Sequence, residues 1–202
     1  MGIKHMTNAI YRAETGKVFW CMIAQLVISI VGVIAALLAI GGAAASIASG
    51  GDGAAAAGGE MVITILLALA GIALNIIILM AYSKLQKDFG DNTIDGSAFG
   101  KMKIAAILAL VGTALSLIPV AGAIISIILS IVAYILYIVA FSALKKSETF
   151  PGTAGASNCF VGYILQIFVI IPIVGSIVAL VGLIMVFVGW NKIKNAPLPE
   201  EA

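Results

Sequence analysis

Charged residues are scarce in this sequence. They make up 10% of the chain, whereas 62% of the residues are hydrophobic. A soluble domain carries about 25% charged residues, which keep its surface hydrated, so the scarcity of charge excludes an ordinary soluble protein. The net charge is only +2, and it gives no indication of a nucleic-acid-binding surface. The composition predicts an integral membrane protein surrounded by the lipid bilayer.

Histidine and cysteine are also scarce. His5, the only histidine, lies next to the N-terminus, which excludes a histidine-based catalytic triad, a two-histidine metal site and a histidine-ligated haem inside the membrane. Cys21 and Cys159 are expected near the inner membrane boundary, as small buried hydrophobic residues rather than a disulfide or redox pair. We therefore predict no enzyme activity, no catalytic residue, no metal site and no bound cofactor.

The few basic residues follow a pattern. All eleven lie at the ends of alternate hydrophobic segments, in four clusters: Lys4, Arg12 and Lys17; Lys84, Lys87, Lys101 and Lys103; Lys145 and Lys146; Lys192 and Lys194. Basic residues are retained on the cytoplasmic side during insertion, so each segment between clusters should cross the membrane and return. The pattern predicts an all-α, polytopic membrane protein with six transmembrane helices in three hairpin repeats and both termini cytoplasmic. The hairpins cover about residues 18–87, 101–146 and 153–195 of a single domain, residues 1–202.

The second and third hairpins are inferred from length. Residues 104–144 carry no charge, and one helix of that length would measure about 60 Å, roughly twice the hydrocarbon thickness. Pro119 near its middle favours two helices joined by a tight turn. The uncharged run 149–191 repeats this design around Pro172 with shorter arms. A helix that begins near Thr153 and a thin re-entrant hairpin both remain open for it.

The first hairpin has a different connection. Its spans, Val18–Ile40 and Met61–Tyr82, are separated by a glycine- and alanine-rich stretch, residues 41–60, whose only charges are Asp52 and Glu60. We expect a flexible outer loop there, because glycine has the least restricted backbone. Two other interpretations are extension of both helices by alanine and a lid over a binding site.

A short pattern closes each hairpin. Residues 81–87, 140–146 and 189–194 share a small residue, an aromatic residue and a small polar residue, followed by aliphatic and basic residues. The pattern is typical of an interfacial anchor, in which an aromatic ring lies at headgroup level and lysines extend toward phosphate. The motif Ile-Pro-x-x-Gly also recurs at 118–122 and 171–175. We interpret these matches as duplication of one hairpin unit, which is found in transporters and equally in packed structural bundles.

One part of the chain carries several such motifs together. The run from Lys103 to Phe150 combines an Ala-Ile-Leu-x-Leu-x-Gly start, a central Ile-Pro-x-x-Gly and a closing Ala-Phe-Ser-x-Leu-Lys-Lys. In these motifs the chain resembles a family of archaeal and bacterial multi-span membrane proteins that carry a domain of unknown function. The resemblance implies a prokaryotic cytoplasmic membrane and no particular activity. The long glycine- and alanine-rich connection departs from the family's compact pattern.

The predicted spans contain no Asp, Glu, Lys, Arg or His. Proton pumps, voltage sensors and ion-coupled transporters usually carry such a residue within the membrane, so its absence argues against these functions. Polar residues inside the spans include Gln25, Asn75, Thr113, Tyr134 and Gln166. We expect them to form hydrogen bonds between helices, because an unpaired amide is unfavourable in a bilayer. Contact with a solute is the alternative.

Small residues recur at helical spacing and predict where helices approach closely. They are Ala105, Ala109, Gly112 and Ser116; Gly122, Ser126 and Ser130; and Gly175, Ala179 and Gly182.

Two functions follow from these observations. The first is a non-enzymatic structural or accessory membrane protein, acting through helix contacts with a partner protein or a second copy. The second is a transporter, channel or solute-binding component for a small neutral or hydrophobic substrate. A cavity lined by the intramembrane amides would favour the second function, and a filled interior with an apolar outer groove would favour the first.

Overall fold

The computed structural model of the chain describes residues 7–48, 54–115, 118, 121–170 and 174–198. These residues form six α-helices and one short 3₁₀ helix, without a strand among them. The elements are α1 (Asn8–Ala48), α2 (Ala54–Phe89), α3 (Ile94–Leu115), α4 (Ala121–Leu144), α5 (Thr153–Gln166), η1 (Ile167–Ile170) and α6 (Val174–Asn195). The prediction of an all-α protein is confirmed.

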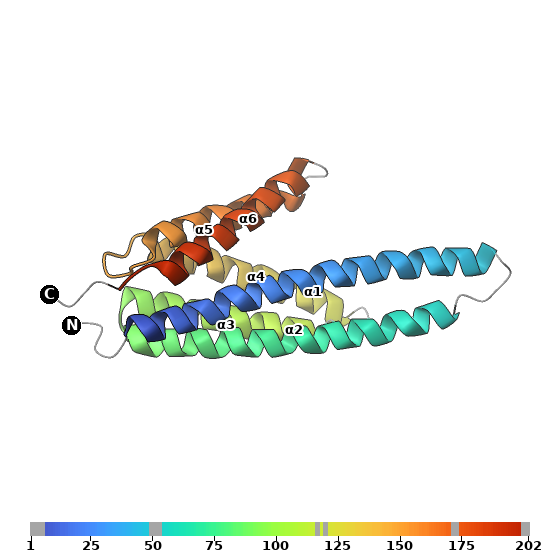
Figure 1. Ribbon diagram of the computed structural model, residues 1–202, viewed down its shortest axis with the longest axis horizontal. Helices are drawn as coiled ribbons and strands as arrows, with labels where there is room; N and C mark the ends of the chain where they lie inside the picture. Colours follow the sequence, from blue (N-terminus) through green and yellow to red (C-terminus); the bar gives the residue numbers. More distant parts are fainter. Residues whose placement is uncertain (1–6, 49–53, 116–117, 119–120, 171–173, 199–202) are drawn as a thin grey trace.

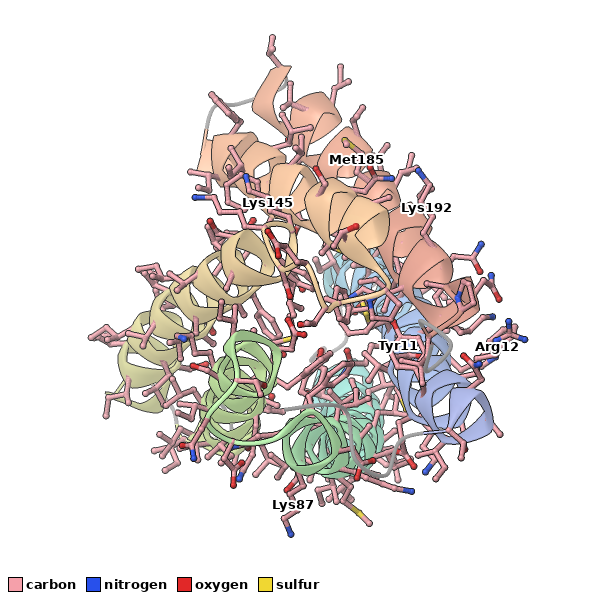
Figure 2. All side chains as sticks on the ribbon, turned by 90° about the vertical axis from the view of Figure 1, so that its left-hand side faces the viewer. Tyr11, Arg12, Lys87, Lys145, Met185 and Lys192 are labelled. Atoms are coloured by element: carbon pink, nitrogen blue, oxygen red, sulfur yellow. The ribbon has the colours of Figure 1, made fainter. Side chains whose placement is uncertain are left out.

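The helices form a closed ring. Each helix packs against its neighbours in the sequence, and α6 packs against α1 to complete the circle. Figure 2 views the ring of helices end-on, with Tyr11 directed to its centre and Arg12 directed away from it. We call the end of the ring that contains Asn8, Phe89, Ile94, Leu144, Thr153 and Asn195 the closed end, and the opposite end the open end. The first and last parts of the chain meet at the closed end, where the Leu198 backbone N–H donates a hydrogen bond of 2.6 Å to Asn8 Oδ1.

Aromatic side chains fill the closed end. Every α-helix contributes at least one ring, and the cluster consists of Tyr11, Tyr82, Phe89, Phe99, Tyr137, Phe141, Phe150, Tyr163 and Trp190. Phe89 stacks on Phe99 with ring centroids 5.4 Å apart, which joins α2 to α3. Trp190 lies 6.1 Å from Tyr82 and 5.8 Å from Phe141, which joins α6 to α2 and α4. Large aromatic side chains from separate helices bury much apolar surface, so this cluster holds the six helices together.

The repeated aromatic motif has a different role from the one expected. Tyr82, Phe141 and Trp190 were expected at headgroup level as interfacial anchors, but they are 2%, 0% and 1% exposed and point into the core. The inward orientation allows Trp190 to contact the other two rings. The lysines that follow remain at the surface, where Lys145 lies 3.4 Å above the Phe160 ring.

The helices separate toward the open end. In Figure 1, α5 and α6 tilt away from the other helices, while α1 and α2 stay side by side and extend beyond the rest. Large apolar side chains are widely exposed in this half; Leu38 reaches 71% and Leu37 reaches 64%. Surfaces of this kind suit a lipid environment.

Five helices among the described residues are long and apolar enough to cross a membrane. They are Asn8–Gly42, Val62–Phe89, Ile94–Leu115, Ile124–Leu144 and Val174–Asn195. Helix α5 has 14 residues and falls short of this length, although η1 follows it directly and adds four residues. In the first of these segments the charges end at Lys17, so the uncharged part begins at Val18.

Helix boundaries differ from the sequence prediction in three places. The glycine- and alanine-rich stretch 41–60, expected as a loop, is helical over 41–48 and 54–60, in line with the high helix propensity of alanine. Helix α1 begins before residue 18 and α3 before residue 101, because Thr7 and Thr93 cap them; each Oγ1 accepts the backbone N–H three residues on, at 3.3 and 2.9 Å. The outer prolines, Asp52, Ser116, Lys4 and His5 lie outside the described residues.

Helices α5 and α6 come into close backbone contact through glycines. A Cβ atom on Gly155 would lie 2.5 Å from the Gly189 carbonyl oxygen, and one on Gly189 would lie 2.6 Å from the Gly155 carbonyl oxygen. Gly162 and Gly182 repeat this reciprocal arrangement at 2.5 Å in both directions. Only Gly182 of these four belongs to a predicted small-residue stripe. Backbone-to-backbone packing of this kind holds apolar helices together where the hydrophobic effect is absent.

Some residues of the other predicted small-residue stripes lie at helix contacts, as expected. Gly112 faces Ser126, whose Oγ would lie 3.5 Å from a Cβ atom on the glycine, so these residues join α3 to α4. Gly122 is buried against the end of α3, where a Cβ atom would lie 2.0 Å from the Leu115 carbonyl oxygen. Ser130, in contrast, is exposed and leaves this contact.

Candidate functional site

A groove opens between α4 and the end of α5. It has a volume of about 550 Å³ and is lined by Ser126, Ile127, Ser130, Ile131, Tyr134, Ile135, Ile138, Gln166 and Ile167. A second cavity of about 440 Å³, lined by Tyr134, Gln166, Ser176, Ala179, Leu180 and Leu183, lies between the same residues and α6. We call the two together the α4–α5 groove. Tyr134 and Gln166 belong to both parts and therefore lie where they meet.

Tyr134 is the residue that links the two walls. Its hydroxyl donates a hydrogen bond to the backbone carbonyl oxygen of Tyr163, from α4 to α5. The two rings also meet edge to face, with centroids 5.3 Å apart. A phenol that donates to a carbonyl keeps lone pairs with which to accept a further hydrogen bond. Tyr134 is therefore both a structural link and a potential acceptor in the groove.

Gln166 is positioned by the end of a helix. It is the last residue of α5, where the backbone changes to the 3₁₀ helix η1. The side chain is half-buried, and within the described part of the chain its amide makes no hydrogen bond. An amide offers two donors and an acceptor. Because Gln166 lines the groove, its full hydrogen-bonding capacity is available to a molecule bound there.

The remaining polar residues predicted from the sequence lie elsewhere. Asn75 Nδ2 donates to the Gly71 carbonyl oxygen at 3.0 Å, and Thr113 Oγ1 donates to the Ala109 carbonyl oxygen at 2.9 Å, each within its own helix. Gln25 is half-buried on α1 and is not part of the groove. Short polar side chains reach the carbonyl one turn back more readily than a neighbouring helix. Of the five predicted residues, the structure brings together Tyr134 and Gln166.

Sequence reasoning missed a buried ion pair at the closed end. Glu14 is buried on α1, and its Oε1 accepts hydrogen bonds from Lys17 Nζ at 2.9 Å and from Lys84 Nζ on α2 at 3.1 Å. Burial by itself would raise the pKa of Glu14, but the hydrogen bonds and charges of the two lysines outweigh it and hold the pKa below its usual value. The spacing Glu14-x-x-Lys17 was the available sequence signal.

A second buried carboxylate ties two connections together. Asp95, in the first turn of α3, is 1% exposed, and its Oδ2 accepts a hydrogen bond of 2.6 Å from Thr149 Oγ1 between α4 and α5. Ser147 Oγ accepts the Phe150 backbone N–H at 3.2 Å and orders the same connection. These contacts join segments far apart in the sequence, which no local pattern could indicate.

The cysteines lie as expected. Cys21 and Cys159 are both buried and unpaired with each other. Cys159 lies within the α5–α6 contact, with its Sγ 3.5 Å from the Val186 carbonyl oxygen. Both behave as small hydrophobic residues of the core.

The ring of long apolar helices, packed at one end and exposed at the other, is that of an α-helical protein embedded in a membrane. Comparison of the chain with known protein families, with curated proteins and with solved structures gave no match. Function must therefore be argued from the groove and its surroundings.

Proposed function

We propose that this protein is a six-span integral membrane protein, built as three hairpin repeats, that binds a small neutral or hydrophobic molecule in the α4–α5 groove. The observation that carries the proposal is the meeting of Tyr134 and Gln166, two of the few intramembrane polar residues, in a cavity otherwise lined mainly by apolar side chains. An apolar pocket with a small number of convergent polar groups is the usual form of a small-molecule site.

Size and charge support this choice of ligand. The two parts of the groove, about 550 and 440 Å³, fall within the roughly 300–1,000 Å³ typical of ligand pockets. Among the described residues that line the groove, none is Asp, Glu, Lys, Arg or His. A charged ligand would lose its hydration there without gaining a counter-ion, so a neutral molecule is favoured.

The proposed topology places the closed end on the cytoplasmic side. Arg12, Lys17 and the other basic residues of the described helices gather at that end, in agreement with the retention of basic residues inside. Helix α5 with η1 would measure about 29 Å, close to the hydrocarbon thickness of about 30 Å, which supports a sixth crossing. A single cysteine at Ile118 should then react with an impermeant thiol reagent from outside, and one at Ser97 should not. Labelling of Ser97 from outside would contradict this topology.

An accessory role through helix contacts is the second candidate. It is favoured by α1 and α2, which extend beyond the other helices and expose Leu37, Leu38 and Ile40 at 64%, 71% and 66%. Apolar surfaces of this extent often contact another protein. In this role the groove would be a packing defect without a ligand of its own.

Photolabelling separates the two candidates. The purified protein in lipid nanodiscs is irradiated with dodecane that carries a diazirine, and the labelled peptides are identified by mass spectrometry. Binding in the groove predicts saturable labelling of the peptides that contain Tyr134 and Gln166. Labelling that rises linearly with probe and is spread over the exposed faces of α1 and α2 would contradict a binding function and favour the accessory role.

A further inference from the structure

We infer that the α4–α5 groove selects a long-chain alcohol, or another uncharged amphiphile whose polar end carries a hydroxyl group. The inference rests on the proposed binding function of the same groove and adds the chemical class of its ligand. It follows from the hydrogen-bonding capacity that Tyr134, Ser130 and Gln166 retain after their contacts within the protein are counted.

Two of the four hydroxyl-bearing residues among the described lining of the groove have already used their protons. Tyr134 donates to the Tyr163 carbonyl oxygen, and Ser130 Oγ donates to the Ser126 carbonyl oxygen at 2.8 Å. A hydroxyl carries a single proton and two lone pairs. Both residues can therefore accept a hydrogen bond from a ligand but cannot donate one without breaking a contact within the protein.

Gln166 supplies the complementary capacity. Its amide has two donor hydrogens and an acceptor oxygen, none of which is paired within the described residues. A ligand hydroxyl satisfies both kinds of group together, since it donates to Tyr134, Ser130 or the amide oxygen and accepts from the amide nitrogen. An ether, ketone or ester accepts only, and leaves the acceptors of the groove unsatisfied. Groups built to bond a hydroxyl discriminate strongly against analogues that lack it.

The rest of the groove fits an aliphatic chain. Ile127, Ile131, Ile135 and Ile138 follow one side of α4, and the lining residues from Ser126 to Ile138 extend over about 18 Å of helix. Ile127, Ile131 and Ile135 are 61%, 56% and 53% exposed, so this wall is continuous with the outer surface of the helix bundle. A chain can therefore enter sideways from the bilayer, with its hydroxyl directed to Gln166.

The test is competition against the diazirine-bearing dodecane in nanodiscs, with four competitors of equal chain length: 1-dodecanol, methyl dodecyl ether, dodecanoate and dodecylammonium. We expect dodecanol to compete at least tenfold better than the other three. Gln166→Leu should remove the preference for dodecanol over the ether while labelling of the groove by the probe persists. Gln166→Met, which keeps the length of the side chain, serves the same purpose should the leucine variant not fold. Gln25→Leu is the matched control, because Gln25 is an intramembrane amide outside the groove, and it should keep the preference.

Each other outcome has a definite meaning. Equal competition by dodecanol and its ether, or stronger competition by either charged compound, would overturn the inference and leave the proposed binding function standing. Retention of the preference in both Gln166 variants would also overturn it, since the amide would then not recognise the hydroxyl. Failure of the probe itself to label the groove saturably would contradict the proposed function.

Discussion

The closed and open ends of the ring are built by different means. At the closed end, rings from all six helices interlock, and the Glu14 ion pair and the Asp95–Thr149 hydrogen bond join separate segments. Toward the open end α5 and α6 tilt away from α4, and large apolar side chains such as Leu37 and Leu38 are exposed. The difference teaches that stability is concentrated at one end, which leaves the other half free to form a groove. A binding site in a weakly packed region can adapt to its ligand without loss of the fold.

The largest difference in the free energy of unfolding is expected between substitutions at Trp190 and at Leu38. Trp190→Ala should lower the free energy of unfolding by about 3–5 kcal/mol, because it leaves a cavity between Tyr82 and Phe141. Leu38→Ala, at a side chain that is 71% exposed, should change it by less than about 0.5 kcal/mol. Unfolding of both variants in mixed detergent and SDS micelles measures the two values. Similar losses of stability in the two variants would contradict the inference that stability is concentrated at the closed end.

A somewhat smaller loss of stability is expected when the glycine contact between α5 and α6 is disrupted. Gly182→Val should destabilise the protein by about 1–3 kcal/mol, because a Cβ atom there would lie 2.5 Å from the Gly162 carbonyl oxygen and force α5 from α6. Gly71→Ala is the control in α2, where nothing lies within 4 Å, and it should stabilise the helix by up to about 1 kcal/mol. The same unfolding assay applies. A neutral Gly182→Val variant would show that the two helices are not in backbone contact.

The smallest effect concerns the ion pair and depends on pH. Glu14→Gln should cost about 1 kcal/mol at neutral pH, since both lysine partners are about half exposed. Because the folded-state pKa of Glu14 lies below its usual value of 4.5, its stabilisation is present above that value and is lost as the pH falls through the folded-state pKa. The difference between wild type and variant should therefore shrink on acidification. A constant difference from neutral pH to below pH 4 would contradict the assigned ion pair.

The sequence predicted the helices better than their orientation. The long uncharged runs and the basic clusters placed the apolar helices, and Thr7 and Thr93 were visible capping residues that could have corrected two of the helix starts. The spans are apolar on all sides, so no periodicity showed that Tyr82 or Trp190 would point inward. Their recurrence at the hairpin ends was noticed, but the choice between core and interface depends on rotation of the helix.

The candidate site was predicted in part for the same reason. Tyr134 and Gln166 stood out as polar residues in apolar segments, as did Gln25 and Asn75. The tilt of α5 and α6 away from α4, seen in Figure 1, depends on packing between helices, and it decides which of these residues line a groove. Asp95 and Thr149 likewise meet through the fold alone.

The most direct test of this account compares distances at the two ends by pulsed electron resonance with spin labels in nanodiscs. One pair of labels, at Lys146 and Lys192, reports on the closed end, and another pair, at Ile128 and Phe168, reports across the groove without lining it. We predict a narrow distance distribution for the first pair that dodecanol leaves unchanged. For the second pair we predict a broader distribution that narrows as dodecanol is added. Equally narrow distributions, neither of them altered by dodecanol, would contradict a rigid closed end that supports an adaptable binding groove.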